Sequence, residues 1–306
     1  MRRWELVFKL RTISSVLTGE DSKTSEYLCK FLSVVEDINL CRKVVLQHRD
    51  YRLRRVLRAS SIRGLLRSAS EYVIEAISRR HFNKVAVCSF LKYEDDSRKP
   101  GMPLCKLPLN PSEDRKLVEY LESIGWLERS GGVTKYYNYP CLACSLFGAL
   151  GIKSPLVVAL QENSGREAFS VEIKDAKITK HRFVHEIRKR ISSPLILESI
   201  PSGCEFTVII SIGRGPCEKL YVRKESFERV ATAALWLAVQ VINAGFFRLG
   251  RFKSRGMGRI YMYPSKESLN VLCEILNCRR NTNVWNELTR KSASFIKTEL
   301  GARLRE

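Results

Sequence analysis

The sequence lacks a long apolar run. None of its 306 residues belong to a stretch approaching the roughly 18 apolar residues of a membrane-spanning helix, and no lipidation signal is present. The first residues, Met-Arg-Arg-Trp-Glu, have no apolar region of the kind found in signal peptides. We therefore expect a cytoplasmic protein without a membrane partner.

Acidic residues are scarce. Asp and Glu number 32 against 53 Lys and Arg, which gives a formal net charge of +21. Such an excess destabilises a folded chain by self-repulsion unless a polyanion neutralises it, so nucleic acid is the expected partner. Because 44% of the residues are hydrophobic, the chain can still build a sizeable core.

The common nucleotide-binding motifs are also missing. A glycine-rich segment, 250–258, follows a helix-like apolar segment, 227–244, and precedes a strand-like run, 259–263. Rossmann and P-loop motifs need the opposite order, with a strand before the glycines and a helix after them. The Lys-Ser pair of the segment also follows Phe252 rather than a glycine. These two nucleotide-binding folds are excluded.

The glycine-rich segment itself suggests a phosphate site. Glycine lets the backbone approach a ligand closely, and exposed amides beside cations form a cradle for phosphates. A solvated basic hairpin tip is the alternative. The candidate RNA-binding residues of this loop are Arg251, Lys253, Ser254, Arg255, Gly256, Gly258 and Arg259.

The clearest helix begins near Ser60 and Ser61, which are good N-cap residues. Apolar residues then recur at spacings of three and four: Ile62, Leu65, Leu66, Ala69, Val73, Ala76 and Ile77. Arg63 and Arg67 are four apart near the helix start, where anions are favoured. We predict that Ser60, Ser61 and these two arginines bind RNA phosphates. The alternative is a surface helix with solvated arginines.

Ten cysteines are scattered along the chain, and one pair has metal-ligand spacing. Cys141 and Cys144 form a CxxC motif, but a structural zinc site needs two more ligands. Cys88, Cys105 and His81 are the candidates for these ligands. Zn²⁺ at Cys141 and Cys144 is therefore a prediction, and small core cysteines are the alternative.

The order of predicted elements indicates an α+β fold. Strands are predicted over 4–10, 85–92, 167–175, 204–212 and 259–263, with the two helices described above among them. This is the order of a ferredoxin-like or RRM-like βαββαβ core. The paired aromatics of an RNA-reading sheet are missing, which favours RNA binding by loops and arms.

Two insertions and a tail complete the predicted organisation. The core spans 1–265, with an arm inserted at about 18–58 and a lid at about 94–139. The segment 266–306 is predicted to form a helical C-terminal extension.

Four segments together resemble a known family. They are Ser60-Ser-Ile-Arg-Gly-Leu-Leu-Arg-Ser68, Cys141-x-x-Cys-x-Leu-Phe-Gly148, Lys253-Ser-Arg-Gly-Met-Gly-Arg259, and the stretch from Arg188 through Pro201-x-Gly203 to Phe206. In this order and spacing the chain resembles the RAMP superfamily of CRISPR proteins. Within it, the chain is most similar to the backbone subunits of type III (Csm/Cmr) effector complexes. The resemblance covers about 36 to 263.

The resemblance implies a guide-binding subunit of a ribonucleoprotein. Its partners would be guide (CRISPR) RNA, complementary target RNA, and other subunits, including copies or paralogues of itself. In catalytic members an aspartate after the first strand cuts target RNA with a divalent metal. Here Asp37 is the candidate, with Asp21 second, and Mg²⁺ the expected metal.

Other functions stay open at this point. The chain departs from the family pattern around Asp37 and is longer than a minimal backbone subunit, which leaves room for a non-catalytic terminal or capping subunit. A guide-precursor-processing endoribonuclease of the same superfamily is a further alternative, with His48 or His81 as general base. An unrelated basic RNA-binding protein is the last.

Overall fold

The computed structural model describes twelve stretches of the chain. They are 4–19, 22–33, 44–49, 56–88, 127–130, 133–137, 141–149, 154–161, 172–176, 195–213, 226–279 and 283–304.

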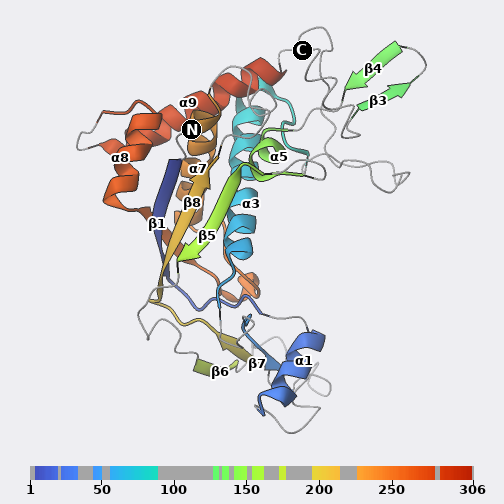
Figure 1. Cartoon of the computed structure of the whole chain (residues 1–306), viewed down its shortest axis with the longest axis vertical. Coiled ribbons are helices and arrows are strands. Elements are labelled where there is room, and N and C mark those ends of the chain that lie inside the picture. Colours follow the sequence, from blue (N-terminus) through green and yellow to red (C-terminus); the bar gives the residue numbers. More distant parts are fainter. Residues whose placement is uncertain are drawn as a thin grey trace, which may run out of the picture.

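A four-stranded antiparallel sheet forms the centre of the molecule (Figure 1). Its strands in spatial order are β5 (Leu156–Gln161), β8 (Glu205–Ile212), β1 (Trp4–Thr12) and β9 (Ile260–Pro264). Leu6, Phe8 and Leu10 of β1 are fully buried, and the residues between them are more exposed, as period-two alternation predicts. Phe8 lies opposite Val208 of β8, which sets the register of the central pair.

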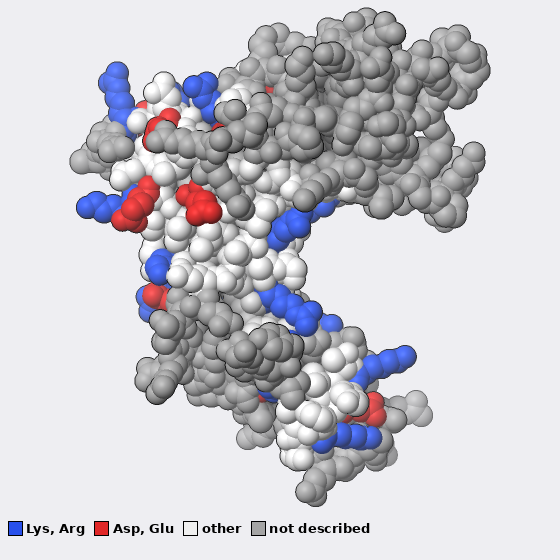
Figure 2. Space-filling view, in the orientation of Figure 1, with Lys and Arg blue, Asp and Glu red and all other residues white. Residues whose placement is uncertain are grey.

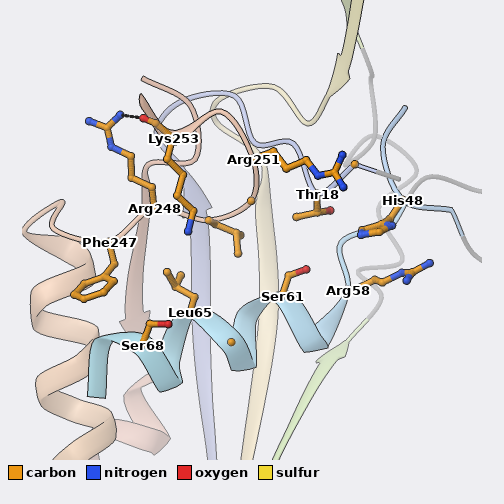
Figure 3. Close-up of a pocket in the computed structure, with 14 residues that line it drawn as sticks. Thr18, His48, Arg58, Ser61, Leu65, Ser68, Phe247, Arg248, Arg251 and Lys253 are labelled. Atoms are coloured by element: carbon orange, nitrogen blue, oxygen red, sulfur yellow. Dashed lines mark hydrogen bonds between the residues drawn. The ribbon is translucent and has the colours of Figure 1, made fainter. Parts of the chain in front are cut away.

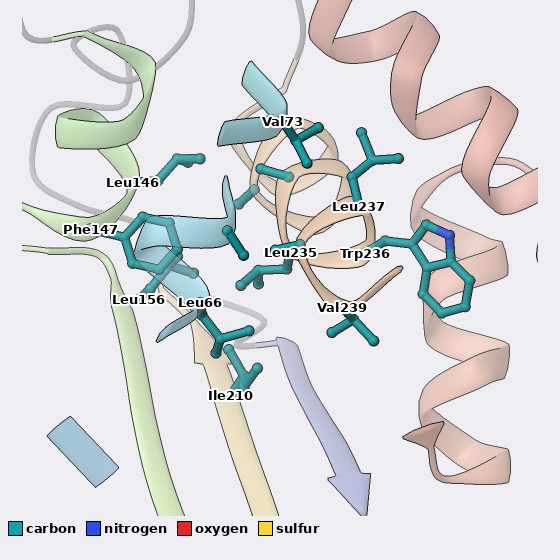
Figure 4. Close-up of a cluster of buried hydrophobic side chains, with 14 of the residues drawn as sticks. Leu66, Val73, Leu146, Phe147, Leu156, Ile210, Leu235, Trp236, Leu237 and Val239 are labelled. Carbon is teal, nitrogen blue, oxygen red and sulfur yellow. The ribbon is translucent and has the colours of Figure 1, made fainter. Parts of the chain in front are cut away.

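Two helices cover one face of this sheet, α3 (Ala59–Phe82) and α7 (Phe227–Asn243) (Figure 1). The chain order β1-α3-β5-β8-α7-β9 combined with the strand order above is that of a ferredoxin-like βαββαβ unit. The predicted fold class is confirmed. Leu66 of α3, Leu235 of α7 and Ile210 of β8 meet in the core between the helices and the sheet (Figure 4).

The second core strand differs from prediction. Residues 85–88 contain no strand, and 89–92 lie outside the described residues. The core position is taken by β5, an apolar run whose outward-facing Val157 is 49% exposed. The predicted strand 167–175 corresponds in part to β6 (Glu172–Ala176), which belongs to another sheet. Sequence alternation detected a strand there but could not assign its partners.

The start of α3 also differs from prediction. Arg58 is the N-cap residue, in an extended conformation and without a side-chain cap hydrogen bond. Ser60 and Ser61 lie inside the first turn, so neither caps the helix. The helix therefore begins two to three residues before the predicted caps, because serine preference for the N-cap is only a local statistical signal.

A second, three-stranded sheet lies below the first in Figure 1. Its order is β2 (Val44–Val45), β7 (Leu195–Ser199) and β6, with α1 (Ser22–Phe31) beside β2. A buried ion pair of 3.0 Å joins Arg49 to Glu198 across it. The described part of the predicted arm therefore packs against the segment that leads into β8.

The segment predicted as a lid is described only in part. It contains the hairpin of β3 (Leu127–Ser130) and β4 (Val133–Tyr137). The rest of 94–139 lies outside the described residues.

The predicted C-terminal helices are confirmed as α8 (Lys266–Ile275) and α9 (Val284–Leu304). Trp236 of α7 donates a hydrogen bond of 3.0 Å from Nε1 to Oγ1 of Thr289, and its ring lies 4.9 Å from that of Trp285. Leu288, Ile296 and Leu300 of α9 are buried in the same core. In the described part of the chain, no helix is both long and apolar enough to cross a membrane.

Candidate nucleic-acid interface

A cavity of about 610 Å³ lies between the first half of α3 and the glycine-rich loop. In Figure 3, Arg58 and His48 lie at one end and Phe247 and Arg248 at the other. Its lining residues are Thr18, Gly19, His48, Arg58, Ser61, Gly64, Leu65, Ser68, Phe247, Arg248, Leu249, Gly250, Arg251 and Lys253. Four separate segments of the chain therefore build one site.

Two glycines give the loop its path. Gly250 and Gly258 have φ values of +83° and +84°, which L side chains rarely adopt. A Cβ atom at Gly250 would lie 2.2 Å from the carbonyl oxygen of Leu17, and one at Gly258 would lie 2.1 Å from that of Leu249. Only glycine permits these close approaches, so the loop can lie directly against the chain that follows β1.

The loop amides differ from the predicted phosphate cradle. The amide of Arg251 donates to Leu17 at 2.7 Å, that of Gly258 to Ser15 at 2.8 Å, and that of Gly256 to Lys253 at 3.2 Å. These donors hold the loop in place and are not offered to a ligand. These three amides therefore do not contribute to a phosphate cradle, and the side chains that line the cavity are candidates for phosphate contacts.

Those side chains are strongly positive. Arg58, Arg248, Arg251 and Lys253 line the cavity together with the hydroxyl groups of Thr18, Ser61 and Ser68, and no carboxylate is among the described lining residues. The guanidinium of Arg248 donates a hydrogen bond of 2.7 Å to the carbonyl of Lys253, which links the residues just before the loop to its middle (Figure 3). Clustered cations on a recessed surface raise the local concentration of an anionic ligand.

Lys and Arg atoms also gather around the hollow on the right of the space-filling view, between the upper and lower parts of the molecule (Figure 2). The cavity opens in the same region, because α3 begins there (Figure 1). The positive surface is therefore wider than the cavity itself.

The predicted loop and helix residues are divided by the structure. Ser61, Arg251 and Lys253 line the cavity. Ser60, Ser254, Gly256 and Arg259 are exposed nearby but do not line it, and the side chain of Arg255 lies outside the description. Asp37 and Asp21 lie outside the described residues as well.

The residues missed from sequence are Thr18, Arg58, Gly64, Ser68, Phe247 and Arg248. Gly64 and Ser68 share helical spacing with Ser61, which was an available signal.

Arg63 and Arg67 lie on a different face of α3. Arg63 donates to the carbonyl of Phe147 at 2.6 Å, and Arg67 donates to that of Gly148 at 3.0 Å. These carbonyls end the short helix α5 (Leu142–Phe147), whose last backbone acceptors need partners. These contacts fix α5 against α3, so neither arginine is simply solvated, and they argue against the role at phosphate, which stays a prediction.

Arg67 is held in its charged form. Partial burial opposes the charge, but the 2.8 Å ion pair with Glu71 outweighs it, and the pKa of Arg67 is raised above its usual value. The sulfur of Cys144 lies 3.7 Å from the same guanidinium. A permanent positive charge therefore sits beside the cysteines of α5.

Three buried cysteines converge at this point. The Sγ atoms of Cys88 and Cys144 are 3.6 Å apart, and those of Cys141 and Cys88 are 3.7 Å apart. A tetrahedral zinc with bonds of about 2.3 Å would place its sulfurs about 3.8 Å apart, so the spacing fits. His81 is not part of this group of donors within 4.8 Å among the described residues, and Cys105 lies outside them. If zinc is bound, these three thiolates would supply three of the four ligands of a structural ion, and the described residues place no fourth ligand in the group.

The two histidines named for acid–base work are far from equivalent. His48 lines the cavity beside Arg58. His81 is exposed in the last turn of α3, where slight desolvation and the charges of Lys297 and Arg80 lower its pKa. Of the two, only His48 has a position from which it could act on a bound phosphate.

A family profile matches most of the chain. Residues 9–261 match the profile of the RAMP superfamily, which covers more than half of the chain. The chain belongs to the RAMP superfamily. The motifs that carry the resemblance therefore identify the superfamily correctly, and the type III assignment stays a prediction.

No curated protein matches the chain. Among solved structures, a chain described as "Type IV-B CRISPR Complex" is similar, with 14% identity and a TM-score of 0.39, over 86% of this chain and 91% of that one. At this identity and TM-score the likeness assigns no function to the chain.

Proposed function

We propose that this RAMP protein is a guide-RNA-binding backbone subunit of a type III CRISPR ribonucleoprotein. The observation that carries the proposal is the cavity between α3 and the glycine loop. Four cations and three hydroxyl groups line it without a described carboxylate. Membership of the superfamily and the net charge of +21 support the same partner.

Phosphate contacts dominate such a site. Arg and Lys would neutralise the RNA backbone, and the hydroxyl groups of Ser61 and Ser68 would donate to phosphate oxygens. Neither type of contact reads the base, so binding would be tight, salt-sensitive and largely independent of sequence. This is what a subunit must do if it holds guides of different sequence.

The double variant Arg251→Ala/Lys253→Ala tests the proposal. We expect RNA affinity to fall roughly 100-fold at moderate salt, because two charge-assisted contacts are lost. The slope of log affinity against log salt should become less steep by about 1.4 for single-stranded RNA. Fluorescence anisotropy with RNAs of several sequences over a salt series measures both quantities.

A matched control removes the same charge elsewhere. Arg80 and Lys297 are exposed on the ends of α3 and α9, away from the cavity residues. Arg80→Ala/Lys297→Ala should change affinity little. Equal losses in the two double variants would mean that only net charge matters, and the cavity would no longer be the binding site.

Target cleavage is the second part of the proposal. Asp37, with Mg²⁺, would assist attack of a ribose 2′-hydroxyl on the adjacent phosphate of bound target RNA. In the assembled complex, Asp37→Ala should abolish regularly spaced cuts in complementary RNA while guide binding is retained, and chelation of Mg²⁺ should do the same. Undiminished cleavage by the Asp37 variant would rule out Asp37 and leave either Asp21 or a non-catalytic terminal or capping role. Asp21→Ala then separates these two, because loss of cleavage in that variant would assign the carboxylate to Asp21.

One observation favours a second candidate, the guide-precursor-processing endoribonuclease. His48 lies in the cavity beside Arg58, where it could accept a proton from a ribose hydroxyl. Such an enzyme would cut precursor RNA as an isolated chain and without metal. Loss of that cleavage in His48→Ala, with His81→Ala unaffected, would select this function over the first.

A further inference from the structure

An exposed group of aromatic rings adjoins the cavity, at the end where Phe247 lies. The ring of Tyr72 is 6.4 Å from that of Phe246, with an angle of 23° between the planes, and 5.6 Å from that of Phe247 in an edge contact. Phe246 is 70% exposed and Tyr72 is 43% exposed. Two large rings that remain this accessible beside a positive cavity need an explanation.

We infer that Tyr72 and Phe246 form a stacking platform for a base of the RNA whose phosphates occupy the cavity. The inference rests on the proposed function and adds a nucleobase contact to it. Each base has a π face, so a platform of this kind accepts any sequence. It would add affinity without adding specificity, as a guide-binding subunit requires.

The helix geometry connects the platform to the cavity. Ser61, Leu65 and Ser68 line the cavity from one face of α3, and Tyr72 follows Ser68 by four residues on the same face. Four residues advance about 6 Å along a helix axis. A nucleotide whose phosphate lies near Ser68 could therefore place its base on Tyr72.

The other side of the platform is fixed by the end of α7. The amide of Gly245 donates to Ile242 at 2.9 Å and that of Phe246 to Val241 at 3.2 Å, while Gly245 itself has a φ of +86°. This left-handed turn ends the helix and directs the chain back toward α3. Because the backbone of Phe246 is already held by its hydrogen bond to Val241, stacking of a base on its ring costs the protein little conformational entropy.

Charge favours RNA over a protein partner for this surface. Phe247 packs edge-on against Tyr72 of the platform and also lines the cavity, together with Arg248 and Lys253. Aromatic rings interleaved with cations along a groove are typical of single-stranded nucleic-acid binding. A second exposed pair, Tyr27 and Phe31 on α1, has similar stacking at 6.2 Å but does not line the cavity, and it provides the control.

The experiment compares binding of a short oligoadenylate with binding of the same strand carrying one abasic position, moved along the strand. The proteins are the wild type, Tyr72→Ala/Phe246→Ala, and the control Tyr27→Ala/Phe31→Ala. We expect the platform variant to bind the intact strand roughly 10-fold more weakly, as the loss of one stacked base predicts. The control should bind as the wild type does.

The abasic strand separates stacking from other effects. For the wild type, one abasic position should reduce affinity by the same factor, and the platform variant should not distinguish the two strands. The salt dependence should not change in either case, because no charge is removed. A fluorescent adenine analogue at the sensitive position should be quenched on binding to the wild type and not to the variant.

Two results would overturn the inference. If the platform variant binds both strands as the wild type does, no base stacks there. If it binds RNA normally but no longer assembles with other subunits, the rings form a protein contact. Either result leaves the proposed function standing as long as Arg251→Ala/Lys253→Ala weakens RNA binding. If that double variant binds RNA as the wild type does, the cavity is not the RNA-binding site.

Discussion

Helix α3 has two polar faces that resemble each other in sequence and differ in their surroundings. On one face, Arg58, Ser61 and Ser68 line the cavity opposite the glycine loop. On the other, Arg63 and Arg67 bind the last carbonyls of α5. Both faces contain arginine near the helix start, where anions are favoured. What lies opposite each face decides whether its arginines serve a ligand or the fold.

The two faces differ because the backbone groups opposite them differ in whether they already have hydrogen-bond partners. The end of α5 presents carbonyl acceptors without helical partners, and two guanidinium groups satisfy them. The glycine loop has already used several of its amides on the chain after β1. Its remaining contribution to the cavity is the side chains of Arg248, Arg251 and Lys253. One face is therefore part of the fold, and under the proposed function the other presents its cations to RNA.

The largest difference between the two faces is expected in stability, at the cysteines beside α5, which lie next to the face of Arg63 and Arg67. We predict one Zn²⁺ per chain at Cys88, Cys141 and Cys144, measured as metal content of the purified protein. Cys144→Ser should lose the metal and about 4 kcal/mol of unfolding free energy, because a bound structural ion stabilises the folded state. RNA binding by the cavity should be unchanged in Cys144→Ser protein that remains folded.

A buried cysteine outside the cluster supplies the control for zinc. Cys273 of α8 is 3% exposed and belongs to the hydrophobic core. Cys273→Ser should retain the metal and lose stability only through an altered core. Absence of zinc from the wild type, with equal destabilisation in both variants, would identify the three cysteines as a small hydrophobic cluster.

A smaller effect is expected from Arg67→Ala. The change removes the hydrogen bonds to Gly148 and Glu71, and the carbonyl at the end of α5 loses its donor. Unfolding free energy should fall by about 2 kcal/mol, measured by urea denaturation. RNA affinity of the folded variant should stay within about two-fold of wild type, since a phosphate contact would be worth more than that. A loss of RNA affinity as large as that of the loop variant would return Arg67 to the binding surface.

The smallest effect is expected from Gly64→Ala, which tests thermal stability and RNA affinity in one variant. Gly64 lines the cavity, and a Cβ atom there would meet nothing within 4 Å. Alanine in a helix is favoured over glycine by about 1 kcal/mol, so thermal stability should rise. If RNA lies against this face, the added methyl group should lower affinity a few-fold.

Ser60→Ala is the control for that change, since Ser60 is exposed on α3 but does not line the cavity. It should leave RNA affinity unchanged. A Gly64 variant with higher stability and full affinity would show that RNA does not approach the helix here.

Much of the fold was predictable because it depends on local patterns. Alternation in 4–10 and 204–212 predicted the central strands β1 and β8, and apolar spacing predicted α3 and α7. The failure at β5 has a clear cause. Its sequence, Leu-Val-Val-Ala-Leu, is a continuous apolar run, so it lacks the polar–apolar alternation that signals a strand elsewhere, although every second residue of β5 is exposed. The second sheet also pairs β2 with β7, whose residues are about 150 apart, and no local pattern encodes such a pairing.

The sequence by itself determined the charge, the superfamily motifs and the conformations that only glycine allows. Net charge is a sum over residues, and the steric limits at Gly250 and Gly258 are properties of a single position. Tertiary structure alone decided which cations share a cavity, which arginines are used to hold α5, and which three cysteines meet. Cys88 and Cys144, for example, are 56 residues apart in the chain and 3.6 Å apart at their sulfurs. Helical spacing states which residues share a face, but only packing supplies what that face meets.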